Sequence, residues 1–308
     1  MLIRHLKFFV TLAEEEHFGR AAELCHVTQP TLSIAIRKLE EDLETALIQR
    51  GHRFMGLTSE GEKVLHWGRQ ILANYDSLLD ELNTEHQGQT GTLRLGVIPT
   101  AMLSVAFISE IFQIENPMAK IEIRSMTSKT IKQALDNYDI DAGISYLNKE
   151  ESDNLNSIPI YIEKYVFACN DKHIPSKKNK IPWQEIIKQP LCLLTDDMQH
   201  RQILNDIAKK AGVHLTPGIV SNSFLGVISH LRSGKWCAIV PHTFALVLQE
   251  SDNIALHEMI APTPQQQIGL ILSARTPHPP MTRALLACSE KYNLEHQFQQ
   301  WLSSRHIN

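Results

Sequence analysis

Several signatures are missing from this chain of 308 residues, and each missing signature argues against a class of protein. The five cysteines are widely spaced and contain no Cys-x-x-Cys, which argues against a disulfide framework or a zinc site and favours a reducing cytosol. No apolar run is long enough to span a bilayer, and the first residues lack the features of a secretory signal. We therefore expect a cytoplasmic protein without a membrane partner.

Catalytic signatures are missing as well. His257-Glu258 is followed by alanine at position 261, where the zinc-protease pattern needs a second histidine. The chain contains no Gly-x-Ser-x-Gly elbow, no phosphate-binding glycine loop and no dinucleotide fingerprint. The fifteen histidines are scattered along the chain rather than grouped. We therefore expect a protein that is not an enzyme and that holds neither a cofactor nor a metal ion.

Residues 17–40, HFGRAAELCHVTQPTLSIAIRKLE, predict two short helices joined by a tight turn. In the second helix the apolar positions recur from Leu32 to Leu39 at the spacing of a helix that packs along one side. Thr28 stands at its N-cap, and Pro30 is tolerated in the first turn because the N–H that proline lacks has no helical partner there. The pattern indicates a helix-turn-helix whose second helix fits the major groove of DNA.

Polar and basic side chains occupy the other side of this second helix. Amides and hydroxyls suit base edges and cations suit phosphates, although the net charge of −4 argues mildly against nucleic acid. A hairpin over residues 49–56 would add a wing with two arginines. The candidates for DNA contact are Arg4, Arg20, Thr28, Gln29, Pro30, Thr31, Ser33, Ile34, Arg37, Lys38, Arg50 and Arg53.

This stretch resembles the amino-terminal domain of LysR-type transcriptional regulators. The resemblance rests on Thr28-Gln29-Pro30, Leu32-Ser33, Ile36, Leu39-Glu40, Arg50 and Leu57-Thr58 with Gly61. It implies a winged helix-turn-helix domain over residues 1–58, double-stranded operator DNA as the partner, and regulation of transcription as the function. Ile34 departs from the family pattern, which usually has a polar or basic residue there, and we expect it to contact a thymine methyl group.

Residues 59–87 predict one long helix that begins with a capping box from Ser59 to Glu62. At about 1.5 Å per residue this helix would be about 43 Å long, and a three-helix head leaves nothing of that length for it to pack on. Its apolar residues alternate by three and four, which is the repeat of a coiled coil. We expect a homodimer, and the family resemblance implies a tetramer of two such dimers. The candidates for dimerisation are Val64, Ile71, Tyr75, Leu78 and Leu82.

The spacing of the apolar residues changes after the polar stretch 88–91, which we interpret as a hinge. Predicted strands at 92–97, 121–126 and 140–145 alternate with predicted helices at 103–114 and 130–135, the pattern of a parallel sheet covered on both faces. A second α/β lobe follows, and the chain returns through a strand at 267–273 to one closing helix at 282–302. The resemblance implies a two-lobed, periplasmic-binding-protein-like α/β effector domain over 92–308, with lobe I at 92–162 and 264–308 and lobe II at 163–263.

In that architecture a small-molecule effector lies between the lobes, where strands end and helices begin. Thr100 and Ser128 also fit as helix N-caps, and Arg201 or Lys129 would pair with an anionic effector. The candidates for effector binding are Thr100, Met102, Thr127, Ser128, Ser145, Tyr146, Thr195, His200, Arg201, Asn222, Phe224, Val240 and Pro241.

Two alternatives stay open at this point. A regulator of the same fold would respond to oxidants through cysteine or methionine, as some members of the family do. From another class of protein, a two-lobed solute-binding protein for transport would fit residues 92–308, but it would leave residues 1–87 without a purpose.

Overall fold

The computed structural model describes residues 3–49, 54–87, 91–147, 155–170, 172–174, 180–263, 265–274 and 276–303, apart from the side chains at 80, 83–87 and 250. The chain divides into two compact units, Met1–Thr90 and Gly91–Asn308. Within the described residues no helix is both long enough and apolar enough to cross a membrane.

The first unit consists of a three-helix head and one long helix. Leu6 and Phe9 of the first helix pack against Leu32 and Leu39 of the third, and all four side chains are buried. Residues 50–53 of the expected wing lie outside the described residues, but Ile48 and Leu57 on either side of them pair in an antiparallel bridge. The elements are α1 (Ile3–Glu15), α2 (Phe18–Leu24), α3 (Gln29–Asp42) and α4 (Ser59–Gln87).

The start of α4 is fixed to the head by contacts that explain why Thr58 and Gly61 belong to the family motif. Thr58 is the capping residue, because its Oγ1 accepts the N–H of Gly61 at 2.9 Å and donates to the carbonyl of Ala46 at 2.7 Å. The expected capping box from Ser59 is therefore wrong, and the Ser59 hydroxyl donates instead to the neighbouring Glu60. A Cβ on Gly61 would lie 2.1 Å from the carbonyl oxygen of Leu47, so only glycine fits at this crossing.

The second unit contains two lobes, and the sheet of lobe I has the expected parallel strands. Strand β1 (Gly91–Val97) pairs in parallel with β2 (Ala119–Ser125) and with β3 (Ala142–Tyr146). The sheet as a whole is mixed, because the returning strand β10 (Gln265–Ser273) is antiparallel to β3. A Cβ on Gly91 would meet Met281, whereas one on Gly96 would meet Ile131, so α10 and α6 cover opposite faces of the sheet.

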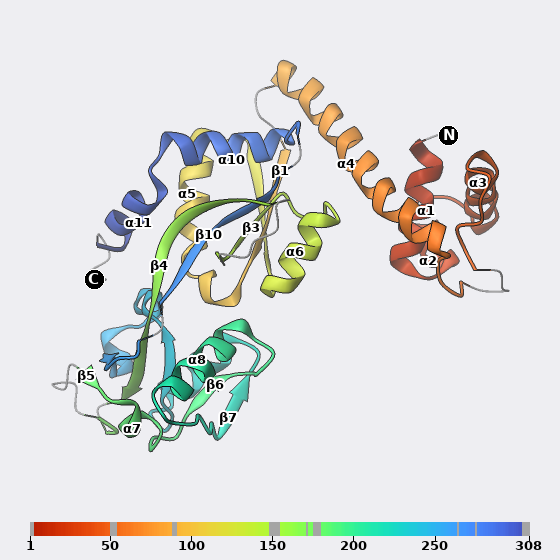
Figure 1. The fold of residues 1–308 in the computed structure, drawn as a ribbon. Helices are drawn as coiled ribbons and strands as arrows, with labels where there is room; N and C mark the ends of the chain where they lie inside the picture. Colours follow the sequence, from red (N-terminus) through yellow and green to blue (C-terminus); the bar gives the residue numbers. More distant parts are fainter. Residues whose placement is uncertain are drawn as a thin grey trace. The chain divides into compact units, whose positions relative to one another are not determined.

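The helices of lobe I lie around this sheet (Figure 1). The single closing helix expected at 282–302 is wrong, because the chain leaves the helical conformation at Tyr292 and begins a second helix at Leu294. The helices of lobe I are α5 (Val105–Glu115), α6 (Ser128–Asp136), α10 (Pro280–Lys291) and α11 (Leu294–Ser303), and the short 3-10 turn η1 (Pro99–Ala101) follows β1.

Lobe II is a second, smaller α/β unit. Two of its strands, β8 and β9, are antiparallel to the long strand that enters from lobe I, and β5 is parallel to β9. A separate parallel pair, β6 with β7, lies beside them. Its elements are β5 (Lys180–Ile181), α7 (Trp183–Ile186), β6 (Cys192–Leu194), α8 (Gln199–Lys210), β7 (Ile219–Ser221), α9 (Phe224–Arg232), β8 (Ala238–Pro241), η2 (His242–Val247), η3 (Glu250–Asp252) and β9 (Ile254–Met259).

One long strand, β4 (Leu155–Asn170), passes from lobe I into lobe II without a break (Figure 1). It pairs with β10 as far as Lys164, and from Tyr165 onward it pairs with β8 and β9. The expected lobe boundary at residues 162–163 therefore falls inside a strand rather than in a loop. The two lobes share a continuous hydrogen-bonded backbone at this crossing.

Candidate functional site

The exposed face of α3 presents the side chains that the sequence predicted for DNA contact. Gln29, Thr31, Arg37 and Lys38 are exposed, and Ile34 is 66% exposed. Thr28 is the N-cap of the helix, and its Oγ1 lies 3.4 Å from the Thr31 nitrogen and 2.8 Å from the Thr31 Oγ1. These contacts fix the first turn of the helix, so the amide of Gln29 projects from a defined position. Of the remaining candidates on this helix, Pro30 is exposed and Ser33 is half-buried.

Three of the predicted cations have partners within the head. Arg20 forms an ion pair with Glu15 at 3.2 Å, and Lys38 lies 3.6 Å from the carboxylates of Glu41 and Asp42. The Arg4 guanidinium lies over the ring of Phe8 at 5.2 Å. Exposed pairs of this kind contribute little stability, so exchanging them for phosphate contacts costs little. The predicted contacts from Arg50 and Arg53 lie outside the described residues.

Helix α4 divides its apolar residues between two sides. Val64, Leu65 and Leu72 pack on the core of the head, so Val64 has a partner inside its own chain. The other four dimerisation candidates are exposed, and the sequence reading missed a further one, Trp67. The exposed large apolar residues of this helix are Trp67, Ile71, Tyr75, Leu78, Leu79 and Leu82.

Between the two lobes of the second unit lies a cavity of about 420 Å³, which we call the first cavity. Lobe I contributes the turn η1 and the start of α6, and lobe II contributes the start of α8. The walls are formed by Ile98, Pro99, Thr100, Thr127, Ser128, Lys129, Tyr146, Leu194, Asp197, Met198, Gln199, His200 and Gln202. The structure therefore brings together five of the sequence candidates, which come from both lobes.

The first cavity has the features of an anion site on one side. Thr127 caps α6 by accepting the N–H of Thr130 at 3.2 Å, while α8 begins after Met198 without a side-chain cap. The starts of two helices thus face the cavity, and helix N-termini favour negative charge. Lys129 adds a cation, and the buried Ser128 Oγ has no hydrogen-bond partner. The expected N-cap role of Ser128 belongs to Thr127, and the carboxylate of Asp197 on the opposite wall is exposed.

A second cavity of about 620 Å³ lies on the other side of η1 and is largely apolar. It holds three more of the candidates, Met102, Asn222 and Phe224, together with Leu225, whose side chain is 71% exposed. Its full lining is Pro99, Met102, Leu103, Ser125, Asn222, Ser223, Phe224, Leu225, Ile228, Arg232, Phe244 and Val247.

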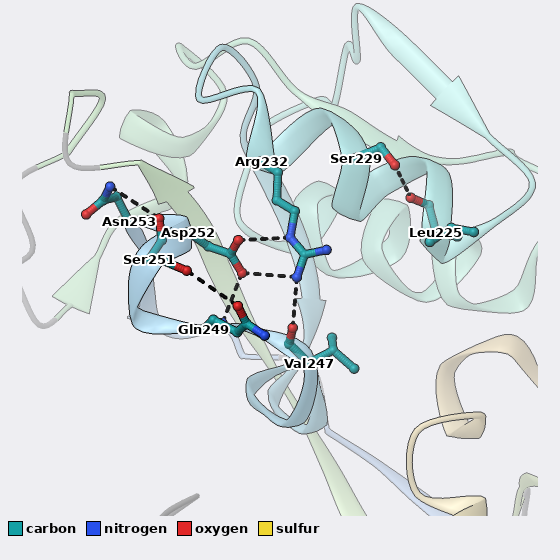
Figure 2. A network of polar contacts seen from close by, with 8 residues as sticks. All are labelled: Leu225, Ser229, Arg232, Val247, Gln249, Ser251, Asp252 and Asn253. Carbon is teal, nitrogen blue, oxygen red and sulfur yellow. Dashed lines mark hydrogen bonds and ion pairs between the residues drawn. The ribbon is translucent and has the colours of Figure 1, made fainter.

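A polar network at the C-terminal end of α9 supports this second cavity (Figure 2). Arg232 donates to both carboxylate oxygens of Asp252, at 2.9 and 3.2 Å, and to the carbonyl of Val247 at 3.2 Å. The N–H of Gln249 also donates to Asp252 at 2.9 Å. The hydrogen bond from Gln249 and the neighbouring Arg232 lower the pKa of the Asp252 carboxyl. The network fixes α9, which contributes half of the lobe II residues that line this cavity.

A buried carboxyl group lies behind the first cavity, at the point where β4 crosses between the lobes. We call Glu163 and the surrounding Thr100, Tyr146, Tyr161 and Tyr165 the hinge cluster. Glu163 is 0% exposed, and its Oε1 accepts the Tyr146 hydroxyl at 3.5 Å. The same hydroxyl lies 3.1 Å from the Thr100 Oγ1 and 3.4 Å from the Tyr165 hydroxyl.

Burial controls the protonation of this cluster. It raises the pKa of Glu163 to about 7, and the hydroxyls of Tyr165, Tyr146 and Thr100 offset only part of that rise. His200 packs against the Tyr165 ring with the ring centres 5.0 Å apart, and burial lowers the pKa of His200 to about 3. His200 is therefore neutral, and both of its ring nitrogens are buried without a partner.

Five of the effector candidates lie outside the walls of both cavities. Arg201 is buried and donates to the Leu194 carbonyl at 2.9 Å and to the Asn205 amide oxygen at 2.9 Å, so it stabilises the start of α8 and is not available to a ligand. Thr195 follows β6, and its Oγ1 is buried without a partner. Ser145, Val240 and Pro241 are interior strand residues.

The sequence reading missed Glu163 as a functional candidate, although one signal was present. Tyr161, Glu163 and Tyr165 alternate with the exposed Ile162 and Lys164, so a carboxyl group occupies a buried position of the strand. It also missed Gln199 and Gln202 of the first cavity and Leu225 of the second.

Both units match families of known proteins. Residues 3–62 match the family described as bacterial regulatory helix-turn-helix protein, lysR family, and residues 86–292 match the LysR substrate binding domain. The second match alone covers more than half of the chain.

Individual relatives and solved structures agree with these matches. The chain is 26% identical over 278 residues to the DNA-binding transcriptional dual regulator OxyR of Escherichia coli, covering 90% of this chain and 91% of that protein. It is 27% identical over 249 residues to the E. coli HTH-type regulator YnfL, covering 80% and 84%. A full-length OxyR variant from Pseudomonas aeruginosa has the same fold, with a TM-score of 0.74, 22% identity and coverage of 96% and 97%. Full-length CbnR in complex with its target DNA has a TM-score of 0.67, 21% identity and coverage of 94% and 99%.

Proposed function

Because this chain belongs to the LysR family of bacterial regulatory helix-turn-helix proteins, we propose that it binds operator DNA through α3 and responds to a small anionic effector in the first cavity. The proposal rests above all on one observation. The exposed face of α3 carries hydroxyl, amide and guanidinium groups on a helix whose first turn is fixed by Thr28, Pro30 and Thr31. Such a surface fits base edges and phosphates in a major groove.

The DNA-binding proposal is tested with the full chain and fragments of its host genome. We expect Arg37→Ala to lose the enrichment of specific fragments, because Arg37 is an exposed cation of α3. The matched control is Lys63→Ala, which removes an exposed cation from α4 instead. Equal enrichment by the two variants would contradict the assignment of α3.

The exposed apolar side of α4 supports self-association. Leu78 and Leu82 are 52% and 53% exposed and lie on the same side of the helix as Trp67. Burying such a seam against a second copy removes apolar surface from water, as in a coiled coil. A two-fold dimer would place two copies of α3 on an inverted repeat of DNA. The pairing of dimers into tetramers stays a prediction from the family.

The dimer proposal predicts that Leu78→Glu shifts the full chain toward monomer by at least tenfold in dissociation constant, because two buried charges would face each other across the seam. Sedimentation velocity measures the shift. The control Glu81→Gln changes a neighbouring exposed residue of the same helix. A dimer of unchanged strength in Leu78→Glu would place the interface elsewhere.

The walls of the first cavity support an anionic effector. Two helix N-termini, Lys129 and the unpartnered Ser128 hydroxyl all favour negative charge, and a cavity of about 420 Å³ suits a small molecule. Effector binding between the lobes would favour one lobe arrangement over another and thereby change how the paired heads engage DNA.

An oxidant-responsive switch is the second candidate, favoured by relatives that are named hydrogen peroxide-inducible genes activators. The thiols of this chain favour it less. Burial raises the pKa of Cys192 and Cys288, and a hydrogen bond with Cys169 together with burial raises the pKa of Cys237. A thiol with a raised pKa forms little of the reactive thiolate. Peroxide treatment followed by mass spectrometry of the intact chain tests this candidate, and rapid oxidation of these thiols would favour it.

A further inference from the structure

Behind the wall of the first cavity, the hinge cluster contains the carboxyl group of Glu163 and no cationic side chain among its members. Glu163 is fully buried, and its Oε2 has no hydrogen-bond partner. The groups that face Glu163 are the hydroxyls of Thr100 from η1, Tyr146 from β3, and Tyr161 and Tyr165 from β4 itself. Lys164 is on the opposite, exposed side of β4. A carboxylate in these surroundings lacks the opposite charge that would stabilise it.

Two further ionisable rings pack around the cluster, and both are neutral. His200 from α8 contacts Tyr165, and His242 from η2 lies edge-on to Tyr161 with the ring centres 6.1 Å apart. Burial lowers the pKa of His200 to about 3 and that of His242 to about 4. The pKa values of Tyr146, Tyr161 and Tyr165 are raised well above their ordinary range, mainly by burial. Glu163 is therefore the member of this cluster that changes charge near neutral pH.

The direction of the hydroxyl protons depends on the state of Glu163. When its carboxylate is ionised it can only accept, so Tyr146 donates to it and the Thr100 hydroxyl donates to Tyr146. The oxygen of Thr100 then faces the first cavity as an acceptor. When Glu163 is protonated it donates to Tyr146, Tyr146 donates to Thr100, and the Thr100 proton is free to point into the cavity.

From this geometry we infer that Glu163 is a positioning residue that decides whether the wall of the first cavity offers a donor or an acceptor, so that an anion binds there together with one proton. The inference rests on the proposed anionic effector and adds the regulation of its binding by pH. An anion needs the donor, which exists when Glu163 is protonated. The affinity is therefore highest below the pKa of Glu163 and falls as the pH rises above about 7.

Sulfate is a suitable probe, because its charge does not change between about pH 6 and about pH 8. The midpoint of thermal unfolding of the full chain is measured against sulfate concentration, with sodium chloride at matched ionic strength as the reference. Lys129→Gln, which removes the cation from the cavity wall, gives the general salting effect of sulfate to be subtracted. For the wild-type chain we expect sulfate binding to be about tenfold weaker at about pH 8 than at about pH 6.

Two variants separate proton positioning from a merely structural role. In Glu163→Gln the amide always offers a donor to Tyr146, so we expect the affinity to stay near the wild-type value at low pH and to lose its pH dependence. In Tyr146→Phe the path from Glu163 to Thr100 is cut and the Thr100 hydroxyl loses its acceptor at position 146, so its proton is free to point into the cavity at every pH. We expect binding near the wild-type value at low pH, again without pH dependence.

The possible outcomes distinguish this inference from the function on which it rests. Sulfate binding that depends on Lys129 but has the same pH dependence in wild type and Glu163→Gln would overturn the role of Glu163 and leave the anion site standing. Sulfate stabilisation that Lys129→Gln does not reduce would overturn the anion site itself. A pH dependence that survives in Tyr146→Phe would show that the proton acts by another path and would also overturn the inference.

Discussion

On the recognition helix α3, the side chains proposed for DNA lie within ten consecutive residues and point into solvent, whereas the walls of the first cavity come from segments about one hundred residues apart. Gln29 and Arg37 need only the helix on which they stand. Thr100 and His200 face one cavity only because β4 and β10 bring two lobes together. The proposed DNA contacts therefore depend on a rigid helix that holds exposed side chains. The proposed effector site depends on buried polar groups where β4 passes between the lobes.

The largest effect that we predict breaks the scaffold of the head. In Gly61→Ala the new Cβ would lie 2.1 Å from the carbonyl oxygen of Leu47, which belongs to the backbone and cannot move aside cheaply. We expect a loss of more than about 3 kcal/mol in the free energy of unfolding of the head. Chemical unfolding followed by circular dichroism measures it.

Gly68→Ala is the matched control, because it adds the same methyl group to the same helix. There the nearest atoms, at 3.0 and 3.2 Å, belong to the side chains of Leu6 and Val10, which are able to shift. We expect a change within about 1 kcal/mol, since alanine also favours the helix. Equal losses in the two variants would contradict the account of Gly61.

The next effect tests the buried carboxyl of the effector domain. The pKa of Glu163 is about 7 in the folded protein against an ordinary value of 4.5, so the folded state binds the proton more tightly than the unfolded state. The resulting stability is fully present below about pH 4.5 and is lost as the pH rises through about 7, a total of about 3 kcal/mol. Glu163→Gln removes this pH dependence.

Urea unfolding at about pH 5 and about pH 8 measures this difference. The fluorescence of Trp183, Trp236 and Trp301 reports on the effector domain, and a Trp67→Phe background removes the signal of the head. If wild type and Glu163→Gln lose stability in parallel between these pH values, the carboxyl titrates normally and the hinge cluster has no special role.

The next prediction, with a smaller expected effect, concerns the proposed DNA contacts of α3. We expect Gln29→Ala to weaken binding to the specific operator by roughly 1–3 kcal/mol, because a bidentate contact to a base edge is lost. The thermal midpoint should not change, since the side chain is exposed. Gel-shift titrations on specific and unrelated DNA measure the loss, and equal weakening on both would mean that Gln29 does not read sequence.

The smallest effect concerns the surface network beside the second cavity. Arg232→Gln removes an ion pair whose Arg232 side chain is 44% exposed, and such pairs contribute about 0.2–1 kcal/mol. We expect a loss toward the upper end of that range, because the hydrogen bond to the Val247 carbonyl is also lost. Lys180→Gln is the control, from a pair in which both side chains are about two-thirds exposed. An equal effect of the two variants on thermal unfolding would remove the special role of Arg232.

The sequence predicted most of the head because its signals are local. The apolar spacing of α3, the Thr28 cap and the unbroken run of α4 each depend on neighbours in the chain. The error at the start of α4 has the same origin. Thr58 and Ser59 both carry a hydroxyl, and only the position of the Ala46 carbonyl decides which of them caps the helix.

The order of strands and helices in the effector domain could be predicted from the sequence, but the strand that passes from lobe I into lobe II could not. The three parallel strands of lobe I alternate with helices along the chain as expected, but β4 runs past Pro159 and through the expected lobe boundary. The break between α10 and α11 also has no strong local signal. Arg201 was predicted as a partner for a ligand, yet its guanidinium already contacts Leu194, Asn205 and the carboxylate of Asp196. Whether a polar side chain faces a cavity depends on residues from distant parts of the chain.

The continuity of β4 also has a mechanical consequence. A hinge made of loop residues swings almost freely about one or two bonds, whereas a strand that is hydrogen-bonded to β10 in one lobe and to β8 and β9 in the other resists rotation. Any closure of the lobes must therefore be shared as a gradual twist of the ribbon over many residues. Twisting that ribbon costs free energy, so a ligand that draws the lobes together would bind less tightly by the amount needed to deform the sheet.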